Sequence, residues 1–474
     1  MKKVILIVIS WAMAWTLSAK SVQSSMHIFM ESPITKYANM GVLLVNLTTG
    51  DTLESFRANS VIPPASTLKT LTTATALEIL GSQFRFQTTL EYSGYIANGV
   101  LYGDLYIHGG CDPTLGNVQD GQGFLNAWVQ AIRNAGILRI EGSIVADMSM
   151  LDGDATNPGW VWEDIGNYYG MGVMSLAYMD NTMNIILHSG PVGSTANVLY
   201  TTPEVPGLQF ENHLRCTTIE YDGAYVHGYA YTNLRYLTGA IPSNLGQFGI
   251  RGDIPNPGLL LAQHLDKWLD HSGIMTTAEP RYITENDRTA RTTVYVHHSM
   301  PLAEIVKRTN HESVNLYAET LYRYLGTRIS VPGTLANSEM IVRNYWRNHG
   351  VDLTGTKILD GCGLAPQDAL SPNSLVQLLT YMNGSKERNA FYNSLPVSGQ
   401  SGTLRSLLSG TPLEGRVHAK SGTIGGTRNY AGYIDMPNGE RWAFAILVNS
   451  ANGKAVQIKN VIERFLLDVY SRNK

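Results

Sequence analysis

Two unequal spacings between three short polar motifs place the strongest limit on how this chain of 474 residues can fold. The motifs are, in order, Ser66-Thr67-Leu68-Lys69, Ser313-Val314-Asn315 and Lys420-Ser421-Gly422-Thr423. About 250 residues separate the first motif from the second, whereas about 100 separate the second from the third. If the three motifs form one site, a long segment is inserted shortly after the first, and we place it at residues 84–290.

The first motif begins a predicted helix. Apolar side chains recur at helical spacing between Ser66 and Gly81, which we expect to end the helix. Residues three apart on a helix share a face, so the Lys69 amine can reach the Ser66 hydroxyl near the first turn, where the helix N-terminus favours an oxyanion. A lysine acts as a base only without its proton, and burial or a second cation lowers its pKa. Lys420 is the candidate for that cation.

The second and third motifs lie at predicted element ends. Ser313 and Asn315 stand between two short helical patterns, 302–306 and 316–324, where side chains can point into a cleft. The third motif ends a run that alternates like a strand, and its glycine allows a ligand backbone to approach the strand edge. Each motif alone is weak evidence, but all three in this order indicate serine acyl transfer without a histidine.

This set of motifs resembles the one found in penicillin-binding proteins and class A β-lactamases. The chain looks like the branch of D-alanyl-D-alanine carboxypeptidases and endopeptidases that carries a large insertion, peptidase family S13. Further similar segments are 64–69, 103–107, 109–115, 360–364, 394–397 and 402–404. Three positions depart from the pattern: Val314 replaces a frequent aspartate, Ser421 a frequent threonine and Cys362 a usual serine.

The resemblance implies a catalytic role for five residues. Ser66 attacks the carbonyl between two D-alanines of a peptidoglycan stem peptide, and Lys69 accepts its proton. Ser313 bridges toward Lys69 and Lys420 and helps to return a proton to the leaving amine. Asn315 bonds the substrate amide, and Lys420 supplies positive charge.

The resemblance also implies how the substrate is held. The hydroxyls of Ser421 and Thr423, on either side of Gly422, bind the terminal carboxylate of the peptide. The backbone N–H groups of Ser66 and Thr423 form the oxyanion hole. β-Lactams acylate Ser66 because they mimic the acyl donor, and no cofactor or metal is required.

The expected fold is α+β, with a serine β-lactamase/DD-peptidase-like catalytic domain interrupted by a β-rich insertion. The catalytic domain comprises 20–83 and 291–474, as an antiparallel sheet flanked by helices. Its predicted strand pairs are 40–46 with 52–56 and 429–434 with 442–448, and a C-terminal helix follows.

Within the insertion, strands are predicted at 88–92, 100–107 and 140–146, with a helix at 124–136. Tyrosine and glycine are dense between Trp160 and Tyr236. This density indicates either a carbohydrate or peptide surface, or simply packing of aromatic residues in strands.

Composition and the N-terminal segment limit the binding partners and the cellular location that we expect for the chain. With a net charge of -3, the chain lacks the excess of basic residues that is typical of proteins that bind nucleic acid. Lys2 and Lys3 precede an apolar stretch and small residues, so residues 1–19 read as a signal peptide, with an uncleaved anchor as the alternative. The mature chain is then exported to the periplasm or another extracytoplasmic space, with no stable transmembrane span.

Three cysteines allow at most one internal disulfide, and the scattered histidines give no zinc ligand set.

Two other classes of function remain open from the sequence. A β-lactamase or esterase would use the same serine, but no glutamate suited to penicillin deacylation can be identified. A catalytically silent cell-wall binding protein would keep the fold without activity, which the complete set of motif side chains argues against.

Overall fold

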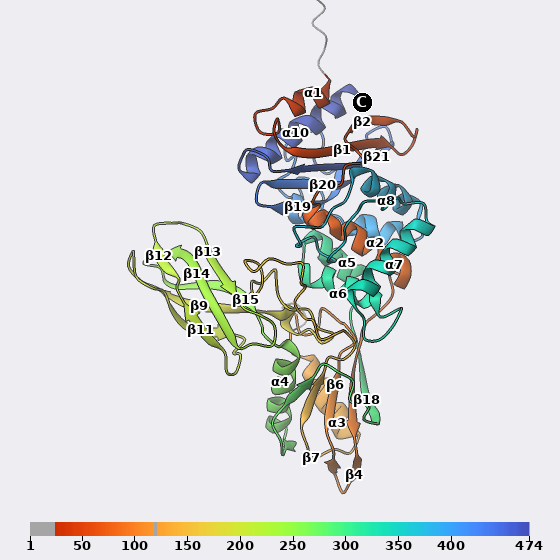
Figure 1. Cartoon of the computed structure of the whole chain (residues 1–474). Coiled ribbons are helices and arrows are strands. Elements are labelled where there is room, and N and C mark those ends of the chain that lie inside the picture. Colours follow the sequence, from red (N-terminus) through yellow and green to blue (C-terminus); the bar gives the residue numbers. More distant parts are fainter. Residues whose placement is uncertain (1–23, 118–120, 474) are drawn as a thin grey trace, which may run out of the picture.

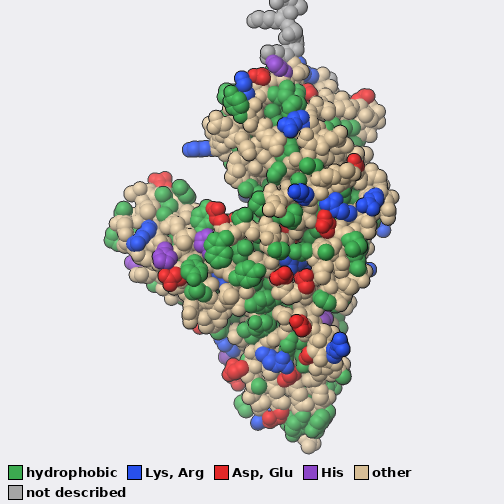
Figure 2. All heavy atoms as spheres, viewed as in Figure 1, with side chains coloured by type: hydrophobic (Ala, Val, Ile, Leu, Met, Phe, Trp, Pro, Cys, Tyr) green, Lys and Arg blue, Asp and Glu red, His purple; other side chains and the backbone are tan. Residues whose placement is uncertain are grey.

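The computed structural model describes residues 24–117 and 121–473. The predicted signal peptide, residues 1–19, lies outside the described residues. Both ends of the described chain meet in the lobe at the top of Figure 1, and the middle of the chain forms the remainder. Figure 2 shows a hollow between this upper lobe and the lobe that projects to the left. Among the described helices, none is both long and apolar enough to cross a membrane.

A five-stranded antiparallel sheet forms the centre of the upper lobe, in the order β19-β20-β21-β1-β2. Its strands are β1 Asn39–Asn46, β2 Thr52–Phe56, β19 Val417–Ile424, β20 Thr427–Asp435 and β21 Arg441–Asn449. Both strand pairs predicted for the catalytic domain are confirmed. Because β1 also pairs with β21, segments from near the two ends of the chain share this sheet.

Both faces of the sheet are covered by helices, as predicted. Successive side chains of a strand point to opposite faces. In β21, Phe444 and Ile446 pack with α1 Ser25–Met30 and α10 Ala455–Arg472, while Ala445 and Leu447 join the helices of the other face. Those helices are α2 Leu68–Leu80, α5 Leu302–His311, α6 Asn315–Gly326, α7 Leu335–Asn348, α8 Pro372–Gly384 and α9 Arg388–Ser394. The predicted C-terminal helix is therefore confirmed as α10.

The helix α2 is buried along its first ten residues, from Leu68 to Leu77. Its threonines use their hydroxyls locally, since Thr73 and Thr75 each donate to a backbone carbonyl four residues earlier at 2.6 Å. The helix ends at Gly81, as predicted, with a φ of 83° that favours glycine. Ser66 lies just before α2 rather than within it, in a 3₁₀ turn over Ala65–Thr67.

The middle of the chain forms four further sheets among the described residues. One contains β3 Gln87–Ser93, β6 Leu105–His108, β8 Ile144–Asp147, β17 Arg281–Ile283 and β18 Arg291–His298. A second contains β4 Tyr95–Ala97, β5 Val100–Tyr102, β7 Arg139–Glu141 and β16 Met275–Thr276. The others are β9 Thr182–Ser189 with β10 Asn197–Thr202 and β15 Gly246–Asp253, and β11 Gln209–Asn212 with β12 Arg215–Thr217, β13 Gly223–His227 and β14 Leu234–Pro242. The predicted helix at 124–136 is α3 Phe124–Asn134, whereas α4 Pro257–His271 was not predicted.

Two segments predicted as single strands are each divided between two sheets at a glycine. The segment 100–107 forms β5 and β6, and 140–146 forms β7 and β8. A side chain on Gly103 would meet the backbone oxygen of Ser93 at 2.1 Å, and one on Gly142 would meet that of Gly103 at 2.2 Å. The chain therefore crosses between the sheets where only glycine allows such close backbone approach.

The strand β18 extends the first of these sheets past the predicted end of the insertion. It pairs with β3, from Arg291 opposite Ser93 to His298 opposite Gln87. The sheet thus contains residues on both sides of position 290. The division into 20–83 with 291–474 and 84–290 stays a prediction.

Candidate active site

The structure brings the three motifs together at the N-terminal end of α2. Lys69 Nζ donates a hydrogen bond to Ser66 Oγ at 2.9 Å and another to Asn315 Oδ1 at 2.7 Å. Lys420 Nζ donates to Ser313 Oγ at 2.9 Å. Two serine–lysine pairs from distant parts of the sequence therefore lie in one site.

Lys69 is fully buried, and its amine is fixed by three acceptors. The third acceptor is the backbone oxygen of Cys362, at 2.7 Å. Burial lowers the pKa of the Lys69 ammonium because the charged form loses its hydration, and the carboxylates of Asp360 and Glu319 oppose that shift. The Lys69 ammonium therefore loses its proton more readily than that of a free lysine, at a position from which the amine could take a proton from Ser66.

Lys420 is also fully buried. Burial, and then repulsion by the Lys69 ammonium, holds the pKa of Lys420 well below its usual value. Burial and a second cation were both predicted to lower the pKa of Lys69; burial is its main cause in the structure, and the repulsion between the two amines lowers the pKa of Lys420. Two neighbouring buried amines titrate as a pair, and the pair avoids the state with two charges.

Ser313 and Asn315 lie at the predicted helix junction, between α5 and α6. Ser313 has a φ of 60°, a left-handed conformation that is strained for a residue with a side chain and persists where the surroundings impose it. Asn315 begins α6, and its Nδ2 donates to the backbone oxygen of Tyr169 at 2.8 Å. A loop from the middle of the chain therefore helps to orient the second motif, which the sequence did not reveal.

The third motif lies on β19, the edge strand of the central sheet. The chain near Pro396 pairs with this edge as far as Ala419. There the backbone N–H of Ala419 donates to the oxygen of Pro396 at 3.1 Å. A side chain on Gly422 would meet the oxygen of Pro64 at 2.7 Å and the nitrogen of Ser66 at 3.1 Å. Glycine thus lets β19 approach the turn that carries Ser66, and an extended peptide can be added beyond Ala419.

The hydroxyls predicted to hold a carboxylate have further polar neighbours. Ser421 Oγ donates to Thr403 Oγ1 at 2.8 Å, and Arg428 Nη1 donates to Thr423 Oγ1 at 2.7 Å. Thr403 lies in the 3₁₀ turn Gly402–Leu404, one of the segments that resemble the family, but neither Thr403 nor Arg428 is among the predicted site residues. A guanidinium beside hydroxyl groups suits a carboxylate ligand.

The Asp360 side chain organises the loop that contacts Lys69. Its carboxylate accepts hydrogen bonds from five N–H groups, at 2.6–3.0 Å, namely those of the Cys362, Gly363, Leu364 and Ala365 backbone and the Trp160 indole. Burial acts to raise the pKa of Asp360, but these donors and a side-chain hydrogen bond with Asp368 outweigh it and hold the pKa below its usual value. The carbonyl of Cys362 is thereby aimed at Lys69.

The three cysteines are all free and buried, so no disulfide joins them. Cys362 lies with Glu319 and Asp360 in a group compact enough to surround a metal ion. Both carboxylates already accept hydrogen bonds, Glu319 from Arg323, Asn157 and the Gly361 backbone. Burial also raises the pKa of the Cys362 thiol well above its usual value, and a protonated thiol is a poor metal ligand. The group therefore suits a structural role behind Lys69.

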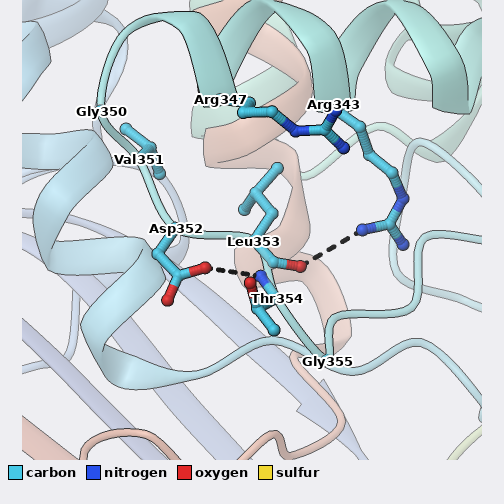
Figure 3. A pocket seen from close by; sticks show the side chains of 8 residues that line it. All are labelled: Arg343, Arg347, Gly350, Val351, Asp352, Leu353, Thr354 and Gly355. Atoms are coloured by element: carbon cyan, nitrogen blue, oxygen red, sulfur yellow. Dashed lines mark hydrogen bonds between the residues drawn. The ribbon is translucent and has the colours of Figure 1, made fainter.

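A cavity of about 400 Å³ lies elsewhere, between α7 and the loop 350–355 (Figure 3). Within it, Arg343 Nη1 donates to the backbone oxygen of Leu353 at 3.2 Å. The carboxylate of Asp352 accepts from the Thr354 backbone at 2.8 Å. None of the described motif residues lines this cavity, which is separate from the serine–lysine site.

A serine bonded to a buried lysine, beside a second serine–lysine pair and the edge of an antiparallel sheet, is the arrangement of the penicillin-binding protein and serine β-lactamase class. Within that class, the chain belongs to the D-Ala-D-Ala carboxypeptidase 3 (S13) family, whose model matches residues 22–468. The family resemblance drawn from the sequence is therefore confirmed.

Individual relatives agree with this membership. Over 446 residues the chain is 27% identical to a D-alanyl-D-alanine carboxypeptidase of Actinomadura sp., a match that covers 90% of this chain and 80% of that protein. It is 23% identical to the D-alanyl-D-alanine carboxypeptidase DacB of Haemophilus influenzae, over 87% of this chain and 85% of that protein.

Solved structures confirm the predicted α+β fold. The crystal structure of penicillin binding protein 4 (DacB) from Haemophilus influenzae matches with a TM-score of 0.82 at 22% identity, over 95% of this chain and 99% of that chain. The same protein complexed with a β-lactam matches with a TM-score of 0.78 at 21% identity, over the same shares of the two chains.

Proposed function

We propose that this protein is a serine-type D-Ala-D-Ala carboxypeptidase that acts on peptidoglycan stem peptides through an acyl-enzyme, and that it also opens cross-links as an endopeptidase. One observation carries the proposal: Lys69 Nζ, buried and with a lowered pKa, donates to Ser66 Oγ at 2.9 Å. Membership of the S13 family supports the same reaction class.

In the proposed acylation, Ser66 Oγ attacks the carbonyl carbon between the two terminal D-alanines while its proton passes to Lys69 Nζ. The backbone N–H groups of Ser66 and Thr423 stabilise the oxyanion, and the loss of one such donor costs about 3–4 kcal/mol of transition-state free energy. The C–N bond then breaks. Ser313, bonded to Lys420, relays the proton that the leaving amine of the terminal D-alanine receives.

Substrate binding in this proposal uses the free edge of β19. The peptide extends along residues 420–423, and the side-chain amide of Asn315 bonds the substrate amide. Ser421 and Thr423 hold the terminal carboxylate, with Arg428 adding positive charge through its bond to Thr423. Water releases the acyl-enzyme. A β-lactam would acylate Ser66 in the same way, but its leaving amine stays attached through the ring and obstructs the water.

Residues 1–19 lead us to propose export to the periplasm or another extracytoplasmic space, where peptidoglycan lies. Cleavage of this segment leaves a mature chain without a stable transmembrane span. The division into a discontinuous catalytic domain and an inserted domain belongs to the same proposal.

Fluorescent penicillin tests the proposal directly. We expect the purified mature chain to be labelled stably at Ser66, identified by mass spectrometry, and the Ser66→Ala variant to remain unlabelled. Release of D-alanine from muropeptide monomers and opening of cross-linked dimers would then separate carboxypeptidase from endopeptidase activity. Rapid turnover of penicillin would instead indicate a β-lactamase. A folded protein that binds cell walls but takes no label would be a silent wall-binding protein.

A further inference from the structure

The loop between β8 and β9 joins the serine–lysine site to the sheets of the projecting lobe. On one side, the backbone oxygen of Tyr169 accepts the Asn315 amide of the second motif at 2.8 Å. On the other, the backbone oxygen of Ile165 accepts the N–H of Gly228, directly after β13, at 3.1 Å. Trp162 lies in the same loop, three residues before Ile165.

Trp162 belongs to a row of aromatic rings with nearly parallel planes. Its ring stacks on that of His227, with centroids 5.9 Å apart and planes 9° apart, and Tyr225 stacks on His227 at 6.1 Å and 10°. The His227 ring is also held by Nε2, which bonds Thr238 Oγ1 at 2.8 Å. His227 is 8% exposed, but Trp162 is 57% and Tyr225 38% exposed. The outer rings of a rigid row therefore face solvent.

The same face of the β13–β14 pair carries another exposed aromatic side chain. Directly paired residues share a face, and His227 pairs with Tyr236, which is 39% exposed. On the opposite face, Val226 packs into the core of the lobe. An antiparallel sheet usually presents polar side chains on its solvated face. Trp162, Tyr225, His227 and Tyr236, which we call the aromatic face, therefore form an unusual surface.

We propose that the aromatic face binds the amino-sugar glycan to which the stem peptides are attached. A pyranose ring presents C–H groups on its faces and hydroxyls around its edge, which matches exposed aromatic faces that carry polar N–H and O–H groups at their rims.

The position of the aromatic face fits a polymer held at two points. An extended stem peptide spans about 3.3–3.6 Å per residue, so its glycan lies only a few residues from the scissile bond. The loop that carries Trp162 also contacts the serine–lysine site, through the bond between Tyr169 and Asn315. This inference rests on the proposed function, since it assigns the glycan end of the same substrate.

The test uses the full mature chain carrying Ser66→Ala and glycan strands from which the peptides have been removed. We expect calorimetry to show binding, and Trp162→Ala or Tyr236→Ala to raise the Kd about tenfold. Trp162→Phe, which keeps an aromatic face, should bind nearly as well as the parent. The matched control is Tyr102→Ala: Tyr102 is 45% exposed and stacks on Tyr95 at 5.2 Å, near the β4 end of the molecule (Figure 1).

Several results would overturn the inference. One is a parent chain that binds no stripped glycan, and another is an equal loss of glycan affinity in Trp162→Ala and Tyr102→Ala. A third is a loss of affinity for free stem peptide in Trp162→Ala that equals its loss for glycan, which would assign the face to peptide. If Trp162→Ala does not fold, Tyr236→Ala decides. Penicillin labelling of the chain with Ser66 intact is measured in parallel. Glycan binding without labelling would reject only the proposed function, and labelling without glycan binding would reject only this inference.

Discussion

Lys69 Nζ lies 2.7 Å from the backbone oxygen of Cys362, 293 residues further along the chain. The proposed base is therefore held by a loop that belongs to none of the three motifs. The loop is itself organised by Asp360, whose carboxylate accepts the backbone N–H groups of residues 362–365. A side chain outside the motifs thus fixes the amine that faces Ser66.

Asp360→Asn should weaken both the fold and the site. The new amide NH₂ would face N–H donors, and each buried donor left unpaired costs about 1–3 kcal/mol. We expect the free energy of unfolding to fall by about 3 kcal/mol in urea denaturation, with slower penicillin labelling of Ser66. Asp352→Asn is the control, because the Asp352 carboxylate makes a similar 2.8 Å bond to a backbone N–H in an exposed turn. Equal losses in the two variants would contradict the role given to Asp360.

Gly422→Ala should separate β19 from the Ser66 turn. The added methyl group would lie 2.7 Å from the oxygen of Pro64 and 3.1 Å from the nitrogen of Ser66, so the strand must move. We expect the rate constant for penicillin acylation to fall about 10- to 100-fold, since a misplacement of about 1 Å has effects of that size. Gly425→Ala is the matched control, because nothing lies within 4 Å of the added methyl group there. Unchanged acylation in Gly422→Ala would show that the close approach is not needed.

The pH dependence of acylation should report a lowered lysine pKa. Burial lowers the pKa of Lys69 from its usual 10.5, so the neutral amine that accepts the Ser66 proton is already abundant below that pH. The rate constant for penicillin labelling should therefore rise with pH through the lowered pKa and level off at a lower pH than an ordinary lysine would give. Stopped-flow labelling across the pH range in which the protein stays folded measures it. A rate that still climbs tenfold per unit near pH 10 would mean that Lys69 keeps an ordinary pKa.

Asp368→Asn should flatten the dependence of stability on alkaline pH. Burial, followed by the nearby Asp360 carboxylate, raises the pKa of Asp368 from 3.8 to about 10. Between those values the folded chain holds a proton that the unfolded chain releases, so stability falls as pH rises through this window. The variant cannot release that proton, and its Tm should fall less than that of the parent between about pH 6 and pH 9. Parallel Tm curves would show that Asp368 ionises normally.

Local patterns were enough to predict much of the fold. The pairs β1–β2 and β20–β21 followed from alternating apolar residues on either side of short turns, and α2 and α10 from helical spacing. The three motifs lie together as expected from their order and the family resemblance, and within each motif the local backbone fixes which side chains share a face. The roles of those side chains in catalysis stay a prediction.

Contacts between distant segments were beyond the reach of such patterns. Nothing in the sequence near Tyr169 or Arg428 indicates that one orients Asn315 and the other bonds Thr423. Likewise, the run 100–107 alternates like one strand, and only the backbone crowding at Gly103 divides it between two sheets. Burial of Lys69 by a loop from residues 360–365 was missed for the same reason, since periodicity reports a local face and not the partner that covers it.

The helices α1 and α10 pack against one another on the face of the central sheet opposite α2, with Phe29 and Phe465 stacked at 4.7 Å. A fusion partner or solid support joined through α10 would therefore lie on the opposite side of the sheet from α2 and the Ser66 turn. Molecules immobilised in this way on a sensor chip would all present the side that carries the serine–lysine site to the flowing solution. Attachment through α10 would thus orient all molecules in the same way, with no linker passing through the site.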